Sequence, residues 1–136
     1  LSETAGKVDI SFVLDTLEFM HKGGRCSAIA ALGANMLKIK PALEVRDGRM
    51  QIYKKYRGNR DAVLRTYVSE RLKGRSIRPA HVFVTHSGEI DPALCEELAE
   101  QIRKTVPVDE ILFGIAGCSV CSHCGPKTLG IIFINE

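Results

Sequence analysis

Apolar and polar residues alternate near the start of the chain. From Val8 to Leu14 every second residue is apolar, which is the period of a strand that buries one face. We therefore predict a strand over about residues 8–14. Asp15 and Glu18 then form a capping-box pattern, which predicts a short helix that ends at the Gly23-Gly24 pair.

The pattern then changes from helical spacing to a hairpin. Residues 28–38 are rich in alanine and glycine and place apolar residues at helical spacing. Asp47-Gly48 separates two strand-like segments, residues 41–45 and 50–57. An Asp-Gly pair between such segments is a strong signal for a two-residue hairpin, so we predict an antiparallel pair of strands.

The second half of the chain alternates helices and strands. Asn59 is a suitable N-cap for a helix that ends at Gly74, and Asp91-Pro92 is typical of the start of another. Three further strands are predicted over residues 80–85, 111–116 and 129–134, the last two as buried strands because they are continuous apolar runs.

The order of these elements predicts the fold class. Six strands and about four helices, with a hairpin that interrupts their alternation, favour an α/β fold. We expect a two-layer domain that contains a six-stranded mixed β-sheet and carries its helices mainly on one side.

The length and composition indicate one domain. A chain of 136 residues with 45% hydrophobic and 26% charged residues has an ordinary single-domain size, so residues 1–136 are treated as one domain. No apolar run approaches the roughly 20 residues that cross a bilayer, which predicts a soluble protein without stable membrane insertion. Three of the five cysteines fall within seven residues; this is not the pattern of a secreted disulfide scaffold, and we expect a cytoplasmic protein.

Charge is distributed unevenly along the chain. The net charge of +3 is small, but residues 54–78 contain nine basic and two acidic residues, whereas residues 89–110 contain seven acidic and two basic residues. The small net charge argues against a general polyanion binder. Aromatic residues do not interleave the basic ones as single-strand nucleic-acid binding would require, so we expect no nucleic-acid partner. Any electrostatic function should be local to a basic face and a separate acidic face.

The segment Gly117–Gly130 is the most unusual predicted loop. His123 lies in it between two predicted strands, where an imidazole is able to hydrogen-bond a carboxylate or phosphate at the strand ends. The simpler interpretation is that a single histidine in a turn is exposed to solvent or bonded locally. The residues alone leave both open.

The same segment contains three cysteines at a spacing of three. Cys118, Cys121 and Cys124 resemble part of an iron-sulfur or zinc site. A four-thiolate site needs a fourth soft ligand, and only the distant Cys26 and Cys95 remain to supply it. A metal or redox domain is therefore the rival functional hypothesis, and small thiols in a tight turn are the structural alternative.

Several motifs, taken in order, resemble the C-terminal half of the DegV family of bacterial fatty-acid-binding proteins. They are LEFMHKGGRCSAIAALGANMLKIKPALEVRDGRM, KYRGNRDA and SHCGPKTLG. The match covers essentially the whole chain, and its specificity comes from the order and spacing of the motifs. The resemblance implies the lipid-binding C-terminal domain of a two-domain protein, with the family's N-terminal domain absent from this chain.

The resemblance also implies a function. Members hold a long-chain fatty acid between their two domains and act as the acyl-carrying subunit of fatty acid kinase, so the carrier is not itself an enzyme and needs no cofactor or metal. The family's histidine that holds the fatty-acid carboxylate corresponds to His123. The arginines associated with the kinase catalytic subunit correspond to Arg25 and Arg57. Lys127 departs from the family pattern, because a second glycine is usual at this position.

An acyl-chain pocket is consistent with the composition of the Ala/Gly-rich helix. Its small and apolar residues form one wall of the expected channel, although they equally suit close packing of the helix on the sheet. The candidate wall residues are Ala28, Ile29, Leu32, Gly33, Met36 and Ile39. A protein-interaction module that has lost its ligand is a further alternative.

Overall fold

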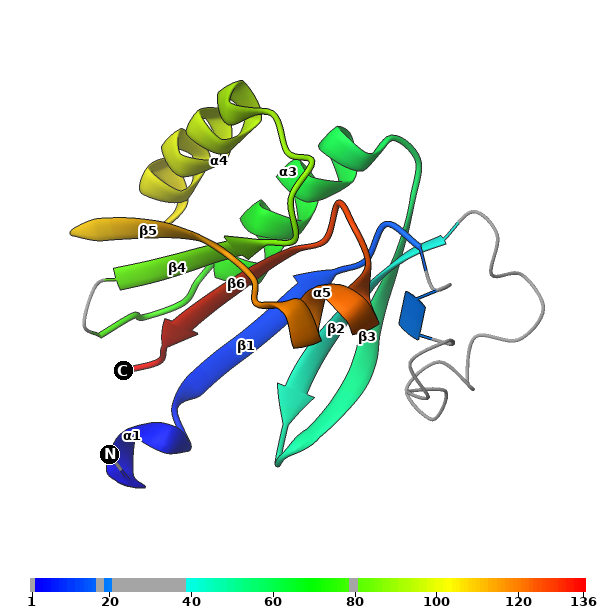
Figure 1. Cartoon of the computed structure of the whole chain (residues 1–136). Coiled ribbons are helices and arrows are strands. Elements are labelled where there is room, and N and C mark those ends of the chain that lie inside the picture. The colour runs from blue at the N-terminus through cyan, green and yellow to red at the C-terminus, as the bar shows by residue number, and fades with distance from the viewer. Residues whose placement is uncertain (1, 17–18, 21–38, 79–80) are drawn as a thin grey trace.

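The computed structural model describes residues 2–16, 19–20, 39–78 and 81–136 (Figure 1). These residues contain a six-stranded sheet. The strands are β1 (Val8–Val13), β2 (Ile39–Arg46), β3 (Arg49–Arg57), β4 (His81–His86), β5 (Glu110–Ile115) and β6 (Leu129–Ile134). The helices are α1 (Ser2–Ala5), α3 (Arg60–Leu72), α4 (Pro92–Thr105) and α5 (Cys118–Cys124).

The sheet is mixed, as predicted. Its strand order is β3-β2-β1-β6-β4-β5, and every neighbouring pair is antiparallel except β4 and β5, which are parallel. Helix α4 connects the two parallel strands, since a parallel connection must cross over the sheet. Asp47 and Gly48 link β2 to β3, and both have positive φ angles of 52° and 73°. A two-residue hairpin of this type requires that conformation at both positions.

Helices α3 and α4 cover one face of the sheet (Figure 1). The side chain of Asn59 accepts hydrogen bonds from the backbone N–H groups at the start of α3, and Asp91 does the same for α4, which confirms both predicted caps. Arg65 of α3 donates to Glu97 of α4 at 2.7 Å. The basic and acidic segments are therefore neighbours at this point, whereas the sequence suggested separate faces.

The main core lies between these helices and the sheet. Fully buried side chains come from both layers, among them Tyr67, Leu72, Leu98, Ile131 and Phe133. Among the described residues, no helix is long and apolar enough to cross a membrane.

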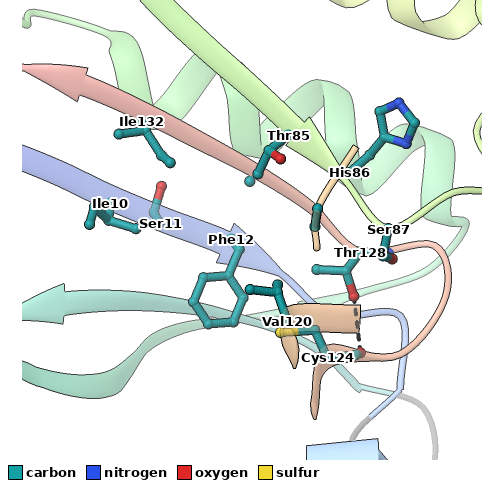
Figure 2. A pocket seen from close by; sticks show the side chains of 12 residues that line it. Ile10, Ser11, Phe12, Thr85, His86, Ser87, Val120, Cys124, Thr128 and Ile132 are labelled. Carbon is teal, nitrogen blue, oxygen red and sulfur yellow. Dashed lines mark hydrogen bonds between the residues drawn. The ribbon is translucent and has the colours of Figure 1, made fainter. Parts of the chain in front are cut away.

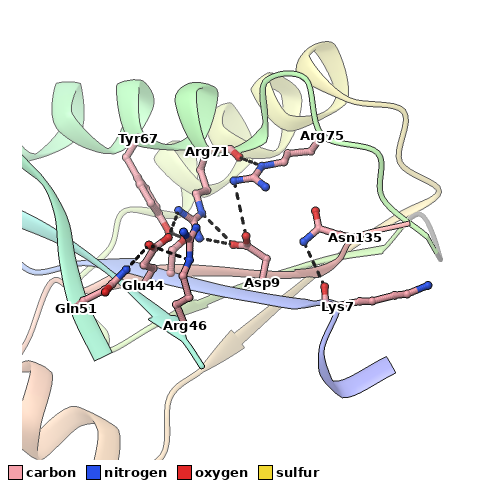
Figure 3. A network of polar contacts seen from close by, with 10 residues as sticks. Lys7, Asp9, Glu44, Arg46, Gln51, Tyr67, Arg71, Arg75 and Asn135 are labelled. Atoms are coloured by element: carbon pink, nitrogen blue, oxygen red, sulfur yellow. Dashed lines mark hydrogen bonds and ion pairs between the residues drawn. The ribbon is translucent and has the colours of Figure 1, made fainter. Parts of the chain in front are cut away.

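A polar cluster fixes α3 to the sheet beside this core (Figure 3). The guanidinium group of Arg71 donates to Asp9 of β1 at 2.9 and 2.6 Å and to Glu44 of β2 at 3.0 Å. Gln51 of β3 donates to the other oxygen of Glu44 at 2.8 Å, and Arg71 lies 4.7 Å from the centre of the Tyr53 ring. The cluster thus joins three strands and one helix through a buried charge whose hydrogen bonds are satisfied.

Two sequence predictions are wrong. Strand β5 was expected to be buried, but it is the edge strand and most of its residues are exposed. The segment Gly117–Gly130 was expected to be a loop, but it begins with the two-turn helix α5. The predicted helix over residues 28–38, and most of the predicted helix that begins at Asp15, lie outside the described residues.

Candidate functional site

The face of the sheet opposite α3 and α4 carries a continuous row of apolar side chains. Residues that pair across strands share a face, and the register brings one apolar residue from each strand into line. From β3 to β5 the row is Met50, Val45, Ile10, Ile132, Phe83 and Leu112. Val45, Phe83 and Leu112 are exposed, so this apolar face is partly open to solvent.

A cavity of about 190 Å³ lies on this face beside α5 (Figure 2). Its apolar wall comes mainly from β1, β6 and α5, and includes Ile10, Phe12, Val120, Cys124, Gly130 and Ile132. Gly130 lies between Phe12 of β1 and Thr85 of β4 in the sheet. A Cβ atom at this position would approach the carbonyl oxygen of Ser11 to 2.9 Å, so the absence of a side chain keeps this part of the sheet surface accessible.

The polar groups at the cavity already have hydrogen-bond partners. The hydroxyl of Ser11 points to the other face of the sheet, where it pairs with that of buried Tyr67 of α3 at 2.7 Å, and the hydroxyl of Thr128 donates to the carbonyl oxygen of Cys124 at 3.0 Å. Nδ1 of His86 accepts from the N–H of Gly88, and its ring points away from Phe12 (Figure 2). The cavity therefore suits an apolar ligand chain better than a polar group.

The segment after α5 is held to the end of β4. The hydroxyl of Ser87 donates to the carbonyl oxygen of Gly125 at 2.6 Å and accepts from the N–H of Thr128 at 3.0 Å. Gly125 has a φ of 79°, and a Cβ atom there would lie 2.4 Å from the ring of Phe19. Lys127 also has a positive φ of 64°, which is the conformation that favours the glycine usual in the family.

His123 is half-buried near the C-terminal end of α5. Its Nδ1 donates to the carbonyl oxygen of Ser119, one turn earlier in the same helix, at 2.7 Å. This bond fixes the ring against α5 and leaves Nε2 as the nitrogen that is able to contact a ligand. Val120 and Cys124 of the same helix line the cavity, whereas His123 lies beside it.

The three cysteines of α5 point in different directions. Cys118 is exposed, Cys121 is half-buried and Cys124 is buried against Leu14 and Leu43. Residues three apart on a helix are rotated by about 60° from one another, which explains the change. In the part of the chain that the structure describes, no three His, Cys, Asp or Glu side chains are arranged to hold a metal ion.

The remaining predicted site residues are only partly described. Arg57, the last residue of β3, is exposed and forms no ion pair within the described ranges. It pairs in register with Ile39, which is buried at the start of β2 and is not part of the cavity wall. Arg25 and the other predicted pocket residues, Ala28, Ile29, Leu32, Gly33 and Met36, lie outside the described residues.

Sequence reasoning missed the open apolar face and the contribution of α5 to the cavity. One signal was available, because an isolated glycine in an apolar strand, here Gly130, often marks a close approach of another group. The positions of Val120 and Cys124 had no such signal, since they depend on a helix that the sequence did not predict.

Comparison with known proteins gives a consistent assignment. The sequence model of the family described as "Uncharacterised protein, DegV family" matches residues 1–136. A DegV domain-containing protein of Clostridium perfringens is 32% identical over 139 residues, which cover 100% of this chain and 46% of that protein. The chain thus spans about half the length of the curated relatives it matches.

Solved structures share the fold. A structure described as fatty acid binding of a DegV family protein from Thermus thermophilus has a TM-score of 0.76 at 26% identity, covering 96% of this chain and 46% of that one. The Fatty Acid Kinase B3 protein of Streptococcus pneumoniae, loaded with linoleic acid, has a TM-score of 0.73 at 18% identity, covering 99% and 47%. Because the family model matches from the first residue to the last and the folds agree, this chain belongs to the DegV family.

Proposed function

We propose that this chain is the C-terminal, lipid-binding half of a fatty-acid carrier. Together with an N-terminal domain it holds a long-chain fatty acid and presents the carboxylate to a fatty acid kinase. In this proposal the chain carries the substrate and does not transfer the phosphoryl group. The Thermus thermophilus relative, described as fatty acid binding, supports the ligand class.

The observation that carries the proposal is the apolar cavity beside α5, which opens onto the apolar face of the sheet. Its polar groups are already bonded within the chain, as Thr128 is to Cys124, so an acyl chain that enters leaves no polar group unpaired. Each buried methylene of the chain contributes about 0.8 kcal/mol. The part of the acyl chain that the cavity does not hold would extend along the open face and against the N-terminal domain.

His123 is the proposed ligand of the carboxylate. Since Nδ1 is bonded to Ser119, Nε2 donates to a carboxylate only when the ring is protonated and both nitrogens carry hydrogen.

Arg25 and Arg57 are the proposed contacts with the kinase. Arg57 is suited to this role because its guanidinium group is exposed and makes no ion pair with a described residue. Other basic residues of the same segment are already paired, such as Lys54 with Glu70 and Arg60 with Asp61. A free charge is available to a partner, whereas a paired charge must first lose its neighbour.

Lipid extraction followed by mass spectrometry tests this function. The protein is expressed from its complete reading frame as wild type, His123→Ala and Arg57→Ala, beside the 136-residue chain alone. We expect wild type and Arg57→Ala to retain palmitate or oleate, and His123→Ala and the shorter chain to retain much less. Arg57→Ala should instead slow turnover by the kinase. Equal loading of wild type and His123→Ala would refute the assigned role of the histidine.

A further inference from the structure

We propose that Cys118 and Cys121 form a reversible dithiol–disulfide site on α5, which exchanges with low-molecular-weight disulfides such as glutathione disulfide. The proposal concerns a modification site at the wall of the cavity and does not depend on what the cavity binds. It rests on the spacing, exposure and contacts of the three thiols of this helix.

The positions of the two cysteines suit a disulfide after a small movement. Residues three apart on a helix have Cβ atoms about 5–6 Å from each other, and a disulfide needs about 3.5–4.5 Å. Cys118 is the first residue of α5, and the N–H groups of the first turn have no partner within the helix. The backbone of Cys118 is therefore free to shift toward Cys121 without the loss of a helical hydrogen bond from its own N–H.

The exposure of the thiols assigns their roles. Cys118 is exposed and is the sulfur that a small disulfide in solution meets first. Cys121 is half-buried, and its thiol donates to the carbonyl oxygen of Ala116 at 3.2 Å. Because Ala116 lies just before α5, this contact draws the Cys121 sulfur toward the end of the helix where Cys118 lies.

Cys124 is excluded from the pair. It is buried against Leu14, Met20 and Leu43, and burial, together with neighbouring Cys121, raises the pKa of its thiol. A buried thiol that keeps its proton is a poor nucleophile. Cys118 and Cys121 therefore form the pair, and Cys124 packs in the core.

The exchange proceeds in two steps. The Cys118 thiolate attacks one sulfur of glutathione disulfide, forms a mixed disulfide and releases one glutathione thiolate. The Cys121 thiolate then attacks the Cys118 sulfur, forms the intramolecular S–S bond and releases the second glutathione thiolate. The protein loses two protons and two electrons, and glutathione disulfide gains both as two glutathione molecules.

Oxidation would alter the cavity wall. Ala116 and Val120 line the cavity, Ala116 accepts the Cys121 thiol hydrogen bond and Val120 lies between the two cysteines in the sequence. Formation of the disulfide removes the thiol proton that Ala116 accepts and tightens the turn that carries Val120. The redox state of the pair is thereby linked to the shape of the site.

Intact mass spectrometry after incubation with glutathione disulfide tests the proposal. The reduced chain should lose two hydrogens, keep no glutathione, and return to its starting mass when dithiothreitol is added. Cys121→Ser should instead hold one glutathione on Cys118, because the second step is blocked, and Cys118→Ser should form no intramolecular disulfide.

Three matched variants identify the pair, because each removes a cysteine outside it. Cys26→Ser, Cys95→Ser and Cys124→Ser should all form the disulfide at the wild-type rate. A wild-type chain that retains glutathione, or that does not react, would overturn the proposal. The same holds if the disulfide persists in Cys118→Ser or disappears in Cys124→Ser.

Discussion

The hydroxyl of Ser87, which follows β4, donates to the carbonyl oxygen of Gly125, which follows α5, over 2.6 Å. The hydroxyl oxygen of Ser87 in turn accepts from the N–H of Thr128 at 3.0 Å. One side chain therefore fixes both ends of the turn that joins α5 to β6, and with it the position of the helix that lines the cavity.

Replacement of this hydroxyl should loosen the turn. Ser87→Ala leaves the buried N–H of Thr128 without its partner and removes one of the two hydroxyls that donate to the carbonyl oxygen of Gly125, and the loss of such a partner costs about 1–3 kcal/mol. We expect a lower midpoint in urea denaturation. Ser122→Ala is the matched control, because the Ser122 hydroxyl donates to Cys118 at an exposed position and its loss should change the midpoint little. Equal midpoints for the two variants would refute the role of Ser87.

Gly125 and Lys127, in the same turn, both have positive φ angles. Substitutions at these two positions should have opposite effects on the free energy of unfolding. Lys127 has a φ of 64°, a conformation that costs a residue with a side chain about 1–2 kcal/mol, so Lys127→Gly should raise the free energy of unfolding by about 0.5–1 kcal/mol. Gly125→Ala should lower it, because the new Cβ would meet Phe19 at 2.4 Å. Chemical denaturation measures both, and a destabilised Lys127→Gly would contradict this account.

Half-buried Tyr53 and fully buried Tyr67 should respond differently to loss of the hydroxyl. The hydroxyl of Tyr53 has no hydrogen-bond partner among the described residues, so Tyr53→Phe should leave stability unchanged or raise it. The hydroxyl of Tyr67 pairs with buried Ser11, so Tyr67→Phe should cost about 1–3 kcal/mol. Thermal unfolding of the two variants tests the difference, and equal losses would contradict it.

Acid should weaken the contact between α3 and the sheet. Burial raises the pKa of Glu44. Hydrogen bonds from Gln51 and Arg71, together with the charge of Arg71, lower the pKa by more than burial raises it, so the pKa of Glu44 lies below 4.5. A carboxyl whose pKa is lowered on folding stabilises the protein above its unfolded pKa, and this stability is lost as the pH falls through the folded pKa. Unfolding temperatures should therefore drop below about pH 4.5.

Glu44→Gln isolates this contribution. The variant should be less stable than wild type at pH 7, because Arg71 loses one of its two carboxylates. Between pH 5 and pH 3 its unfolding temperature should fall less than that of wild type. Parallel acid curves for the two proteins would assign the acid sensitivity to other groups.

The sequence predicted those parts of the fold that local signals determine. The alternation in Val8–Val13, the Asp47-Gly48 turn and the cap at Asn59 each depend on nearby residues, and all three are confirmed. The exposure of β5 was not predictable in the same way. Its run of apolar residues is the same whether another strand or solvent lies beside it, and only the strand order decides between them.

The candidate site was less predictable than the fold. Helix α5 consists mostly of serine and cysteine, which have weak helix propensity, so its formation depends on tertiary contacts such as those of Cys124. The cavity then draws its wall from β1, β4, β6 and α5. His123 was found by resemblance, but its bond to Ser119 required the helix to be known.

The most direct test of the central claim is the affinity of the full-length protein for palmitate. It is measured for wild type, Val120→Glu and Ile115→Glu. Val120 lines the cavity and Ile115 does not, and both are exposed, at 50% and 76%, so neither change should unfold the protein. A carboxylate beside a buried acyl chain is strongly unfavourable. By isothermal titration calorimetry, Val120→Glu should bind palmitate at least about tenfold more weakly than wild type, with Ile115→Glu within about twofold. Wild-type affinity in Val120→Glu would contradict the assignment of this cavity to the fatty acid.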